Sequence, residues 1–341
     1  MRAAVYGGPR DVQIADVSEP GEPRDEEVIV RVALAAICGT DATEWDHGPV
    51  LARPPVTLGH EFGGVVHRAG RSAGFATGRR VVSGAGVWCG RCEWCRRGRT
   101  NLCAEYWTLG LQADGGLAEF VRVPARTLVA APDELTDQAM AIAQPSAVAL
   151  HAVRRARVEA GESCAVVGVG GIGALIVAGA RSRGVSRLIA VDVDDARLAT
   201  ARALGATHTV NVDDGDVAES IRSLTDGIGP DVVIEASGSP NAPGAALAAV
   251  KKGGRVLLVG LQGAPRELDL LRATVNEVEL LTTLAHVCQE DLPDAVRLLA
   301  DATITDLVVD RVIPLTALVE QGLEPLATRS AAGKILVDPT S

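Results

Sequence analysis

The sequence has no apolar segment long enough to cross a membrane. Its longest apolar run beside a predicted helix, ALIVAGA at 174–180, is far shorter than the roughly 20 residues of a spanning helix. The initial stretch MRAAVYGGPRDVQIADV also lacks the apolar core of a secretory signal. We therefore expect a cytoplasmic location, where thiols stay reduced and disulfides are rare.

Positive charge and aromatic side chains are also scarce. The chain has 33 Lys and Arg against 43 Asp and Glu, for a net charge of -10. An acidic surface repels the phosphates of nucleic acids and of anionic membranes, so we expect neither as a partner. Aromatic residues make up 3% of the chain, a share that suits a polar substrate as well as an apolar one.

The distribution of hydrophobic residues indicates two domains, for which 341 residues are sufficient. The first 130 residues are typical of short strands and loops, as in EEVIVRVALAAIC at 26–38. The pattern changes near residue 137. Beyond the strand-like SCAVV at 163–167, apolar strands alternate with amphipathic helices. This alternation predicts an α/β fold with a doubly wound parallel sheet.

A glycine motif stands at the start of that second region. Gly168, Gly170 and Gly173 form G-x-G-x-x-G directly after SCAVV, where glycine allows a tight turn and a close approach to a pyrophosphate. Asp192 ends the next predicted strand about 20 residues on, where a carboxylate binds ribose hydroxyls and repels a 2′-phosphate. The motif predicts NAD rather than NADP, and a glycine-rich turn without a ligand is the simpler alternative.

Cysteine is uncommon, yet four of the seven cysteines fall within one short loop. They are Cys89, Cys92, Cys95 and Cys103, with the spacing C-x2-C-x2-C-x7-C. Four thiolates can complete a tetrahedral zinc shell, which leaves no position for a substrate. The spacing therefore predicts a structural zinc ion, with an iron–sulfur cluster or unligated thiols as alternatives.

A second set of metal-ligand residues is dispersed in the sequence. Cys38, His60 and Glu61 offer a thiolate, an imidazole and a carboxylate, which would leave one zinc position open for substrate or water. Taken alone, Cys38 is equally well a buried core cysteine and His60 a structural histidine.

Taken together, these motifs resemble those of the zinc-containing medium-chain alcohol dehydrogenases. The resemblance extends over essentially the whole chain and rests on CGTD at 38–41, GHEFGGVV at 59–66, the four-cysteine lobe, GVGGIG at 168–173 and KILVDP at 334–339. The stretch from CGTD to GHEF is most similar to the branch that holds butanediol, sorbitol and threonine dehydrogenases.

The resemblance implies a GroES-like, mostly-β catalytic domain at 1–147 and 287–341, with the structural zinc lobe at 85–105. It implies a Rossmann domain at 148–286, two zinc ions per chain, NAD as coenzyme, and a homodimer or homotetramer. Its expected reaction is reversible hydride transfer between a secondary alcohol, such as a diol, sugar alcohol or amino alcohol, and NAD. A zinc-independent enone or quinone reductase and a redox-inactive NAD-binding sensor are the alternatives.

The resemblance also assigns roles to single residues. Cys38, His60 and Glu61 become the ligands of the catalytic zinc, and Thr40 supplies the hydroxyl that hydrogen-bonds the substrate oxygen. Gly171 and Ile172 join the glycines of the coenzyme loop. Arg197 flanks the adenine, unless it is an ordinary solvated charge on a helix.

Two positions depart from the family pattern. Gln144 stands where the family has a glutamate that binds the catalytic zinc directly or through water, and Gln144 can offer only a neutral amide oxygen. Thr43 stands where relatives often carry a histidine that passes the substrate proton to solvent. His47 could take over that relay, and Trp45 could line the substrate pocket or serve ordinary packing.

Overall fold

The structure, a computed structural model, describes all 341 residues, and these divide into two compact units. Unit 1 comprises residues 1–147 and 286–341, and unit 2 comprises residues 148–285. None of the helices combines the length and the apolar character that a membrane span requires.

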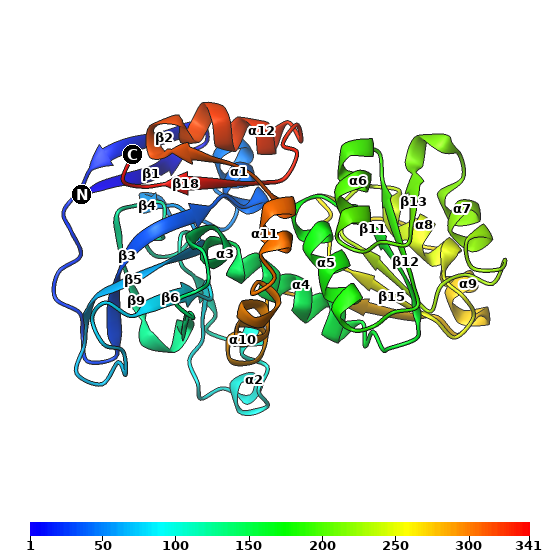
Figure 1. The fold of residues 1–341 in the computed structure, drawn as a ribbon, viewed down its shortest axis with the longest axis horizontal. Coiled ribbons are helices and arrows are strands. Elements are labelled where there is room, and N and C mark those ends of the chain that lie inside the picture. Colours follow the sequence, from blue (N-terminus) through cyan, green and yellow to red (C-terminus); the bar gives the residue numbers. More distant parts are fainter. The chain divides into compact units, whose positions relative to one another are not determined.

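Unit 1 consists mainly of β-strands (Figure 1). Its strands are β1 (Arg2–Gly8), β2 (Asp11–Asp16), β3 (Glu27–Ala36), β4 (Val56–Thr57), β5 (Glu61–Ala69), β6 (Arg80–Ser83), β7 (Gly86–Val87), β8 (Trp107–Thr108), β9 (Phe120–Pro124), β10 (Leu128–Ala130), β17 (Val309–Pro314) and β18 (Lys334–Asp338). The larger sheet has the order β10-β6-β5-β3-β18-β17, with β9 also paired to β3, and a smaller sheet has the order β2-β1-β4. Strands β7 and β8 form a separate ribbon.

Strand register in unit 1 brings together segments that are far apart in the sequence. Ala36, near the end of β3, pairs with Glu61 at the start of β5. On its other side Ala36 pairs with Leu336 of β18. The N–H of Ile37 then donates to the carbonyl of Ile335 at 3.0 Å. This end of the sheet therefore collects residues from three parts of the chain.

The helices of unit 1 correct one sequence expectation. Residues 39–47 were expected to belong to strands and loops, but they form α1 (Gly39–His47). The helix begins there because Cys38 is an extended N-cap whose N–H donates to the Asp41 carboxylate at 2.9 Å. The other helices are α2 (Glu93–Arg96), α3 (Asp137–Ala141), α10 (Cys288–Leu298), α11 (Ala302–Val308) and α12 (Glu324–Ala327).

Helix α4 (Ala143–Arg155) contains the boundary between the two units. Pro145, which interrupts the helical pattern in the sequence, lies in the first turn of α4. A proline is tolerated there because the first N–H groups of a helix have no intrahelical acceptor.

Unit 2 is the predicted doubly wound parallel sheet. Its strands, β11 (Ser163–Val167), β12 (Arg187–Asp192), β13 (His208–Asn211), β14 (Val232–Glu235), β15 (Arg255–Leu258) and β16 (Glu279–Thr282), have the order β13-β12-β11-β14-β15-β16. All neighbouring pairs are parallel. The helices are α5 (Gly171–Ser182), α6 (Asp195–Ala203), α7 (Val217–Ser223), α8 (Ala242–Ala249) and α9 (Leu270–Val275). The strand order reverses on either side of β11, and ligands bind at such a point in this fold.

The aromatic residues are confined to unit 1. Residues 148–285 contain no Phe, Trp or Tyr, and all four tryptophans lie in residues 1–147. The core of unit 2 is therefore built from Val, Ala, Ile and Leu. Tryptophan fluorescence consequently reports on unit 1.

Hydrogen bonds to the Asp231 carboxylate connect the beginnings of β11 and β14. The N–H and the hydroxyl of Ser163 donate to the Asp231 carboxylate at 2.8 and 2.5 Å, and Lys251 also donates to that carboxylate. Partial burial raises the pKa of Asp231, but the hydrogen bonds from Lys251 and Ser163 outweigh burial and lower the pKa to about 2.

We predict that Asp231→Asn destabilises the protein by about 1–2 kcal/mol near neutral pH, after allowance for solvent screening of a partly exposed group. The folded pKa lies below the ordinary value of 3.8. The stabilisation is therefore complete above about pH 4 and disappears as the pH falls towards 2. Urea unfolding followed by circular dichroism at pH 7, 5, 4 and 3 measures the difference. Asp226→Asn, which affects an exposed ion pair with Arg187, is the control and should change stability by less than about 0.5 kcal/mol. A loss that stays constant down to pH 3 would contradict the assignment.

Candidate metal and dinucleotide sites

Cys38, His60 and Glu61 meet at the end of the large sheet of unit 1. Their ligand atoms lie within 4.8 Å of one another, His60 and Glu61 are buried, and Cys38 is half-buried. The pairing of β3 with β5 explains the meeting, because it sets Glu61 opposite Ala36, two positions before Cys38. One sulfur, one nitrogen and one oxygen donor at this separation suit a zinc ion.

Asp41 contacts two of the three donor residues, Cys38 and His60. It is fully buried, and one of its carboxylate oxygens accepts the N–H of Cys38. The other oxygen lies 3.5 Å from Nδ1 of His60, and neither of these two atoms has another hydrogen-bond partner. A carboxylate on Nδ1 leaves Nε2 as the metal-binding nitrogen of His60.

Lys334 supplies a buried positive charge beside Glu61. Its ammonium donates to the Glu61 carboxylate and to the carbonyl of Ile37 at 3.1 Å. Strand β18 places it there through its pairing with β3. Burial lowers the pKa of Lys334, but the negative charge of Glu61 and Cys38 outweighs burial and raises it.

The same balance governs His60. Burial lowers the pKa of its imidazole, but the negative charge of Asp41 and Cys38 outweighs burial and raises the pKa well above 6.5. The surroundings of the three donors therefore favour a cation at this position.

The hydroxyl residues of α1 differ in their surroundings. Oγ1 of Thr40 lies 3.6 Å from Sγ of Cys38, at the edge of the donor cluster. Thr43 is exposed and its hydroxyl donates to the carbonyl of Gly39 at 2.9 Å. His47 is exposed, with Nδ1 2.8 Å from the Asp46 carboxylate. Thr40 is thus the hydroxyl nearest to the donors.

Trp45 and Gln144 are both buried. Trp45 belongs to the hydrophobic core of unit 1. The guanidinium carbon of Arg10 lies over the Trp45 ring, 4.1 Å from the ring centre. This position favours packing over a role in a substrate pocket. Gln144 lies in the first turn of α4.

Glu44 fixes α1 to the loop that follows it. Its buried carboxylate accepts the N–H of Val50 at 2.8 Å and of Leu51 at 2.6 Å. Its carbonyl accepts the hydroxyl of Tyr6 and the N–H of Gly48. The helix that begins at Cys38 is therefore held at both ends.

The four cysteines of the lobe come together as the spacing predicts. The Sγ–Sγ distances are 3.5 Å between Cys92 and Cys95, 3.9 Å between Cys92 and Cys103, and 4.0 Å between Cys89 and Cys95. Backbone N–H groups of Cys89 and Glu105 donate to the sulfur of Cys103. Such N–H donors stabilise thiolates, and the four sulfurs form a closed donor set.

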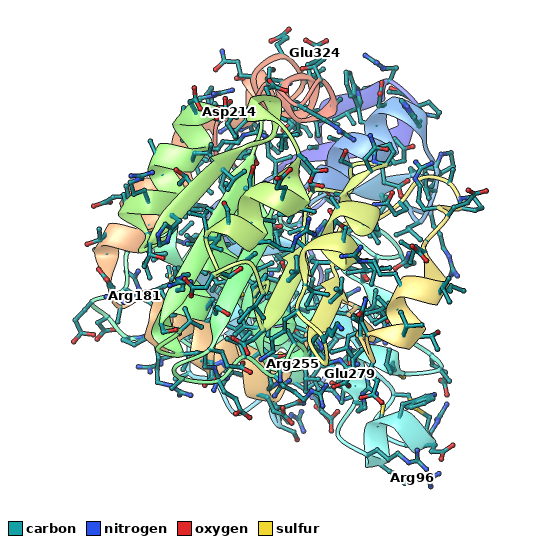
Figure 2. All side chains as sticks on the ribbon, turned by 90° about the vertical axis from the view of Figure 1, so that its right-hand side faces the viewer. Arg96, Arg181, Asp214, Arg255, Glu279 and Glu324 are labelled. Carbon is teal, nitrogen blue, oxygen red and sulfur yellow. The ribbon has the colours of Figure 1, made fainter.

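Two of the four arginines of the lobe pair with its two glutamates. Arg91 forms two hydrogen bonds with Glu105, and Arg97 pairs with Glu93 across one helical turn. Arg96 projects from α2 at the periphery of the molecule (Figure 2). Nothing in this arrangement adds a substrate site to the lobe.

The glycine motif forms the turn between β11 and α5. Gly168 has a φ of +85°, a conformation that favours glycine. A Cβ on Gly173 would collide with the carbonyl of Gly168. Helix α5 begins at Gly171, with Ile172 in its first turn. The turn has the tight geometry that a pyrophosphate site requires.

Asp192 lies at the end of β12, beside this turn. Its carboxylate accepts the N–H of Val169 at 2.8 Å and of Val193 at 2.9 Å. Nη1 of Arg197 lies 3.8 Å from the same carboxylate, and the Arg197 side chain is only 19% exposed. The sequence left two roles open for Arg197, contact with the adenine or a freely solvated helix charge. Its limited exposure and its proximity to Asp192 do not fit the second role.

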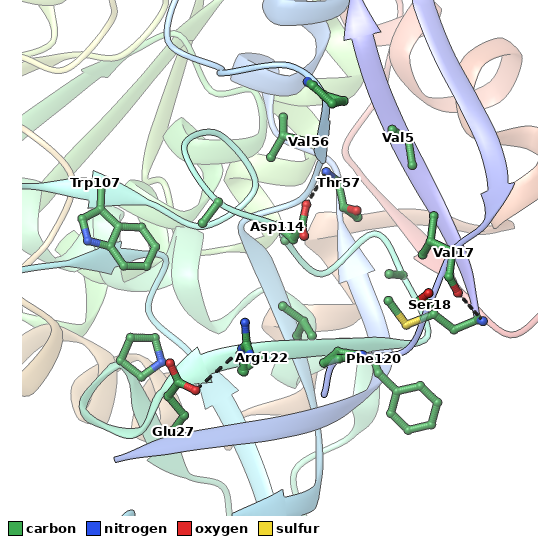
Figure 3. A pocket seen from close by; sticks show the side chains of 18 of the residues that line it. Val5, Val17, Ser18, Glu27, Val56, Thr57, Trp107, Asp114, Phe120 and Arg122 are labelled. Carbon is green, nitrogen blue, oxygen red and sulfur yellow. Dashed lines mark hydrogen bonds and ion pairs between the residues drawn. The ribbon is translucent and has the colours of Figure 1, made fainter. Parts of the chain in front are cut away.

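A cavity of about 550 Å³ in unit 1 lies apart from these donors (Figure 3). It is lined by residues that include Thr57, Trp107, Asp114, Phe120 and Arg122. Its polar groups pair within the chain: the N–H of Thr57 donates to Asp114, and Arg122 pairs with Glu27. The cavity contains none of the predicted site residues.

The sequence analysis missed two residues that contact the donor cluster, Asp41 and Lys334. Asp41 stands three positions after the N-cap Cys38, which is the spacing of a capping box and a usable signal. Lys334 is a lone cation at the head of an apolar strand, and such a residue usually has a buried acidic partner. The identity of that partner depends on the pairing of β18 with β3.

Similarity to known proteins agrees with this geometry. Residues 24–133 match the alcohol dehydrogenase GroES-like domain, and residues 171–301 match the zinc-binding dehydrogenases. Sorbitol dehydrogenase from Bacillus subtilis strain 168 is 35% identical over 266 residues, covering 76% of this chain and 75% of that protein.

Solved structures are similar over nearly the whole length. A zinc-binding dehydrogenase from Sinorhizobium meliloti 1021 bound to NADP is 32% identical, with a TM-score of 0.92 and 99% coverage of both chains. The 2R,3R-butanediol dehydrogenase from Bacillus subtilis is 29% identical, with a TM-score of 0.91 and 99% coverage of both chains.

We predict that Lys334→Met lowers the free energy of unfolding of unit 1 by about 3–5 kcal/mol, because it leaves the buried Glu61 carboxylate without its cation. Adding Glu61→Gln should recover part of the loss. Urea unfolding followed by tryptophan fluorescence, in chelator-treated protein, measures both variants. Lys252→Met, at an exposed position, is the control. A loss below about 1 kcal/mol would show that water screens the pair.

Proposed function

Because the chain belongs to the zinc-containing medium-chain alcohol dehydrogenases, we propose that it transfers hydride reversibly between a secondary alcohol and NAD. The substrate class is a diol, sugar alcohol or amino alcohol. The observation that carries the proposal is the meeting of Cys38, His60 and Glu61 in one buried donor cluster.

In this proposal Cys38, His60 and Glu61 hold the catalytic zinc, a Lewis acid that makes an alcohol hydroxyl more acidic. Asp41 sets the orientation of His60 through Nδ1, and Lys334 holds the Glu61 carboxylate in place. Gln144 contributes a neutral amide oxygen at most, so it adds no negative charge to the donor set.

Thr40 handles the substrate proton. Its hydroxyl lies beside Cys38, where it can accept a hydrogen bond from the substrate hydroxyl and pass the proton outward. Thr43 does not replace the family's relay histidine directly, since its hydroxyl is bonded to the Gly39 carbonyl. His47, exposed and paired with Asp46, remains the candidate at the outer end of a relay through water.

The four-cysteine lobe, by this proposal, holds a second, structural zinc. Cys89, Cys92, Cys95 and Cys103 form a closed donor set that leaves no open position. The lobe stabilises the catalytic domain and takes no part in the reaction.

The coenzyme, which accepts hydride at its nicotinamide ring, binds to unit 2. Gly168, Gly170 and the start of α5 receive the pyrophosphate, and Asp192 receives the adenosine ribose. We propose NAD as the preferred coenzyme, because the Asp192 carboxylate repels a 2′-phosphate. Arg197 lies beside that carboxylate and weakens the repulsion, so activity with NADP should be lower but measurable.

We also propose that the chain assembles through unit 2. Strand β16 is the edge of the parallel sheet. Exposed apolar side chains gather in and around β16 and α9, namely Leu270, Leu271, Val275, Leu280 and Leu284. An edge strand can pair with the same strand of a second copy about a two-fold axis, which buries such a patch on both copies.

We predict two zinc ions per chain and formation of NADH from at least one vicinal diol or polyol. Cys38→Ser should leave one zinc per chain and reduce kcat/KM by at least about 1000-fold, because it disrupts the catalytic donor set. Elemental analysis and absorbance at 340 nm measure both, over a panel of diols, polyols, amino alcohols and simple secondary alcohols.

Cys288→Ala is the matched control, since that buried thiol donates to the carbonyls of residues 126 and 127 and belongs to neither cysteine donor set. Turnover by Cys38→Ser at the wild-type rate would contradict the proposal. One zinc per chain in the wild type, without turnover on any alcohol, would favour a coenzyme-binding sensor.

We predict that Leu271→Asp shifts the protein from an oligomer towards monomers. A charge placed in a desolvated interface costs several kcal/mol. Light scattering coupled to size-exclusion chromatography measures the mass. Ile228→Asp, at an exposed apolar position of unit 2 outside the patch, should leave the mass unchanged. An oligomer that survives Leu271→Asp unaltered would rule out this surface.

A further inference from the structure

Glu235 is a fully buried carboxylate that none of the roles above uses. It ends β14 and has no exposed surface. Isolated charges are rarely buried to this extent without several hydrogen bonds. Its partners therefore indicate what the charge does.

All hydrogen bonds of its side chain go to the loop that follows β14. Oε1 accepts the N–H and the hydroxyl of Ser237 at 2.8 and 2.6 Å, and the N–H of Gly238 at 3.0 Å. Its carbonyl accepts the N–H groups of Val259 and Gly260. One residue thus fixes both the loop after β14 and the loop after β15.

The loop after β14 packs directly against the glycine turn. A Cβ on Gly168 would lie 2.6 Å from the backbone nitrogen of Ser237. The N–H of Ala236 also donates to the carbonyl of Val167 at 2.8 Å. The position of Ser237 is therefore coupled to the position of the glycine turn that is proposed to bind the pyrophosphate.

The second carboxylate oxygen is enclosed by glycine. Oε2 is buried without a hydrogen-bond partner, and a Cβ on Gly260 would lie 2.8 Å from it. The same Cβ would lie 2.2 Å from the backbone nitrogen of Gly238, so an added methyl group there would displace both the carboxylate and the loop that it holds.

The strand order shows which half of a dinucleotide these loops serve. β11 lies between β12 and β14. Asp192, at the end of β12, receives the adenosine ribose. The rest of the dinucleotide, beyond the pyrophosphate at the end of β11, therefore extends towards the ends of β14 and β15.

We propose that Glu235 is a positioning residue for the nicotinamide half of the coenzyme. Its buried carboxylate holds Ser237 and Gly238 in the conformation that receives this half, and its backbone carbonyl binds the start of the loop after β15. The inference rests on the proposed binding of NAD to unit 2 and adds a determinant that lies across β11 from Asp192.

The test compares a ligand that contains the nicotinamide half with one that lacks it. Calorimetric titration with NADH and with AMP is carried out on the wild type, Glu235→Ala, Glu235→Gln and Gly260→Ala. Glu235→Ala should raise the Kd for NADH by at least about tenfold, because the loop after β14 loses its preorganisation. The Kd for AMP should stay within about twofold, since AMP occupies only the β12 side.

The isosteric Glu235→Gln, whose amide oxygen can still accept from Ser237 and Gly238, should recover most of the NADH affinity. Gly260→Ala, whose methyl group would collide with the Gly238 backbone and with the Glu235 carboxylate, should displace the loop after β14 and reproduce the selective loss. Glu219→Ala, which removes an exposed carboxylate of α7, is the control and should match the wild type.

Unchanged NADH binding in both Glu235→Ala and Gly260→Ala overturns the inference, and so does an equal loss of NADH and AMP affinity. Wild-type protein that binds neither NADH nor AMP overturns the proposed coenzyme, and the inference with it. Wild-type binding without a selective loss overturns the inference alone.

Discussion

Unit 1 is organised around the neutralisation of buried charge. The buried Asp41 and Glu61 and the half-buried Cys38 bring three acidic groups together, and Lys334 supplies one buried positive charge there. In their metal-binding forms these groups leave two negative charges, which one divalent ion balances. A glutamate in place of Gln144 would add a third. The substitution at Gln144 therefore suits a cluster in which Lys334 and one zinc ion complete the charge balance, and the pairing of β18 with β3 is what brings Lys334 there.

The two proposed metal sites differ in how much of each the sequence reveals. The four lobe cysteines lie on one short loop, so their spacing predicts their convergence without knowledge of the fold. Cys38 and the His60–Glu61 pair are separated by a helix and a loop, and spacing alone leaves them open to other interpretations. The resemblance to a known family named these three residues, and the pairing of β3 with β5 explains why they meet.

Sequence patterns predicted the parallel sheet of unit 2 and the glycine turn because these depend on local periodicity. They failed for α1, where the short segment after Cys38 has mixed polarity and its helix depends on Asp41 as a cap and Glu44 as an anchor. Lys334 and Glu235 were missed for another reason. Each residue acts through partners that come near only through strand order or loop packing. A single charged residue in an apolar strand does not indicate which residues those partners are.

The absence of aromatic rings from unit 2 limits how that unit can recognise a dinucleotide. Stacking on Phe, Tyr or Trp side chains is not available between residues 148 and 285. Under the proposed binding of NAD to unit 2, recognition comes from backbone N–H groups at the glycine turn, from the charges of Asp192 and Arg197, and from the loop that Glu235 holds in place. Backbone groups do not distinguish NAD from NADP, which differ by one phosphate on the adenosine ribose. The choice therefore depends on the balance between a carboxylate that repels that phosphate and a guanidinium, 3.8 Å away, that attracts it.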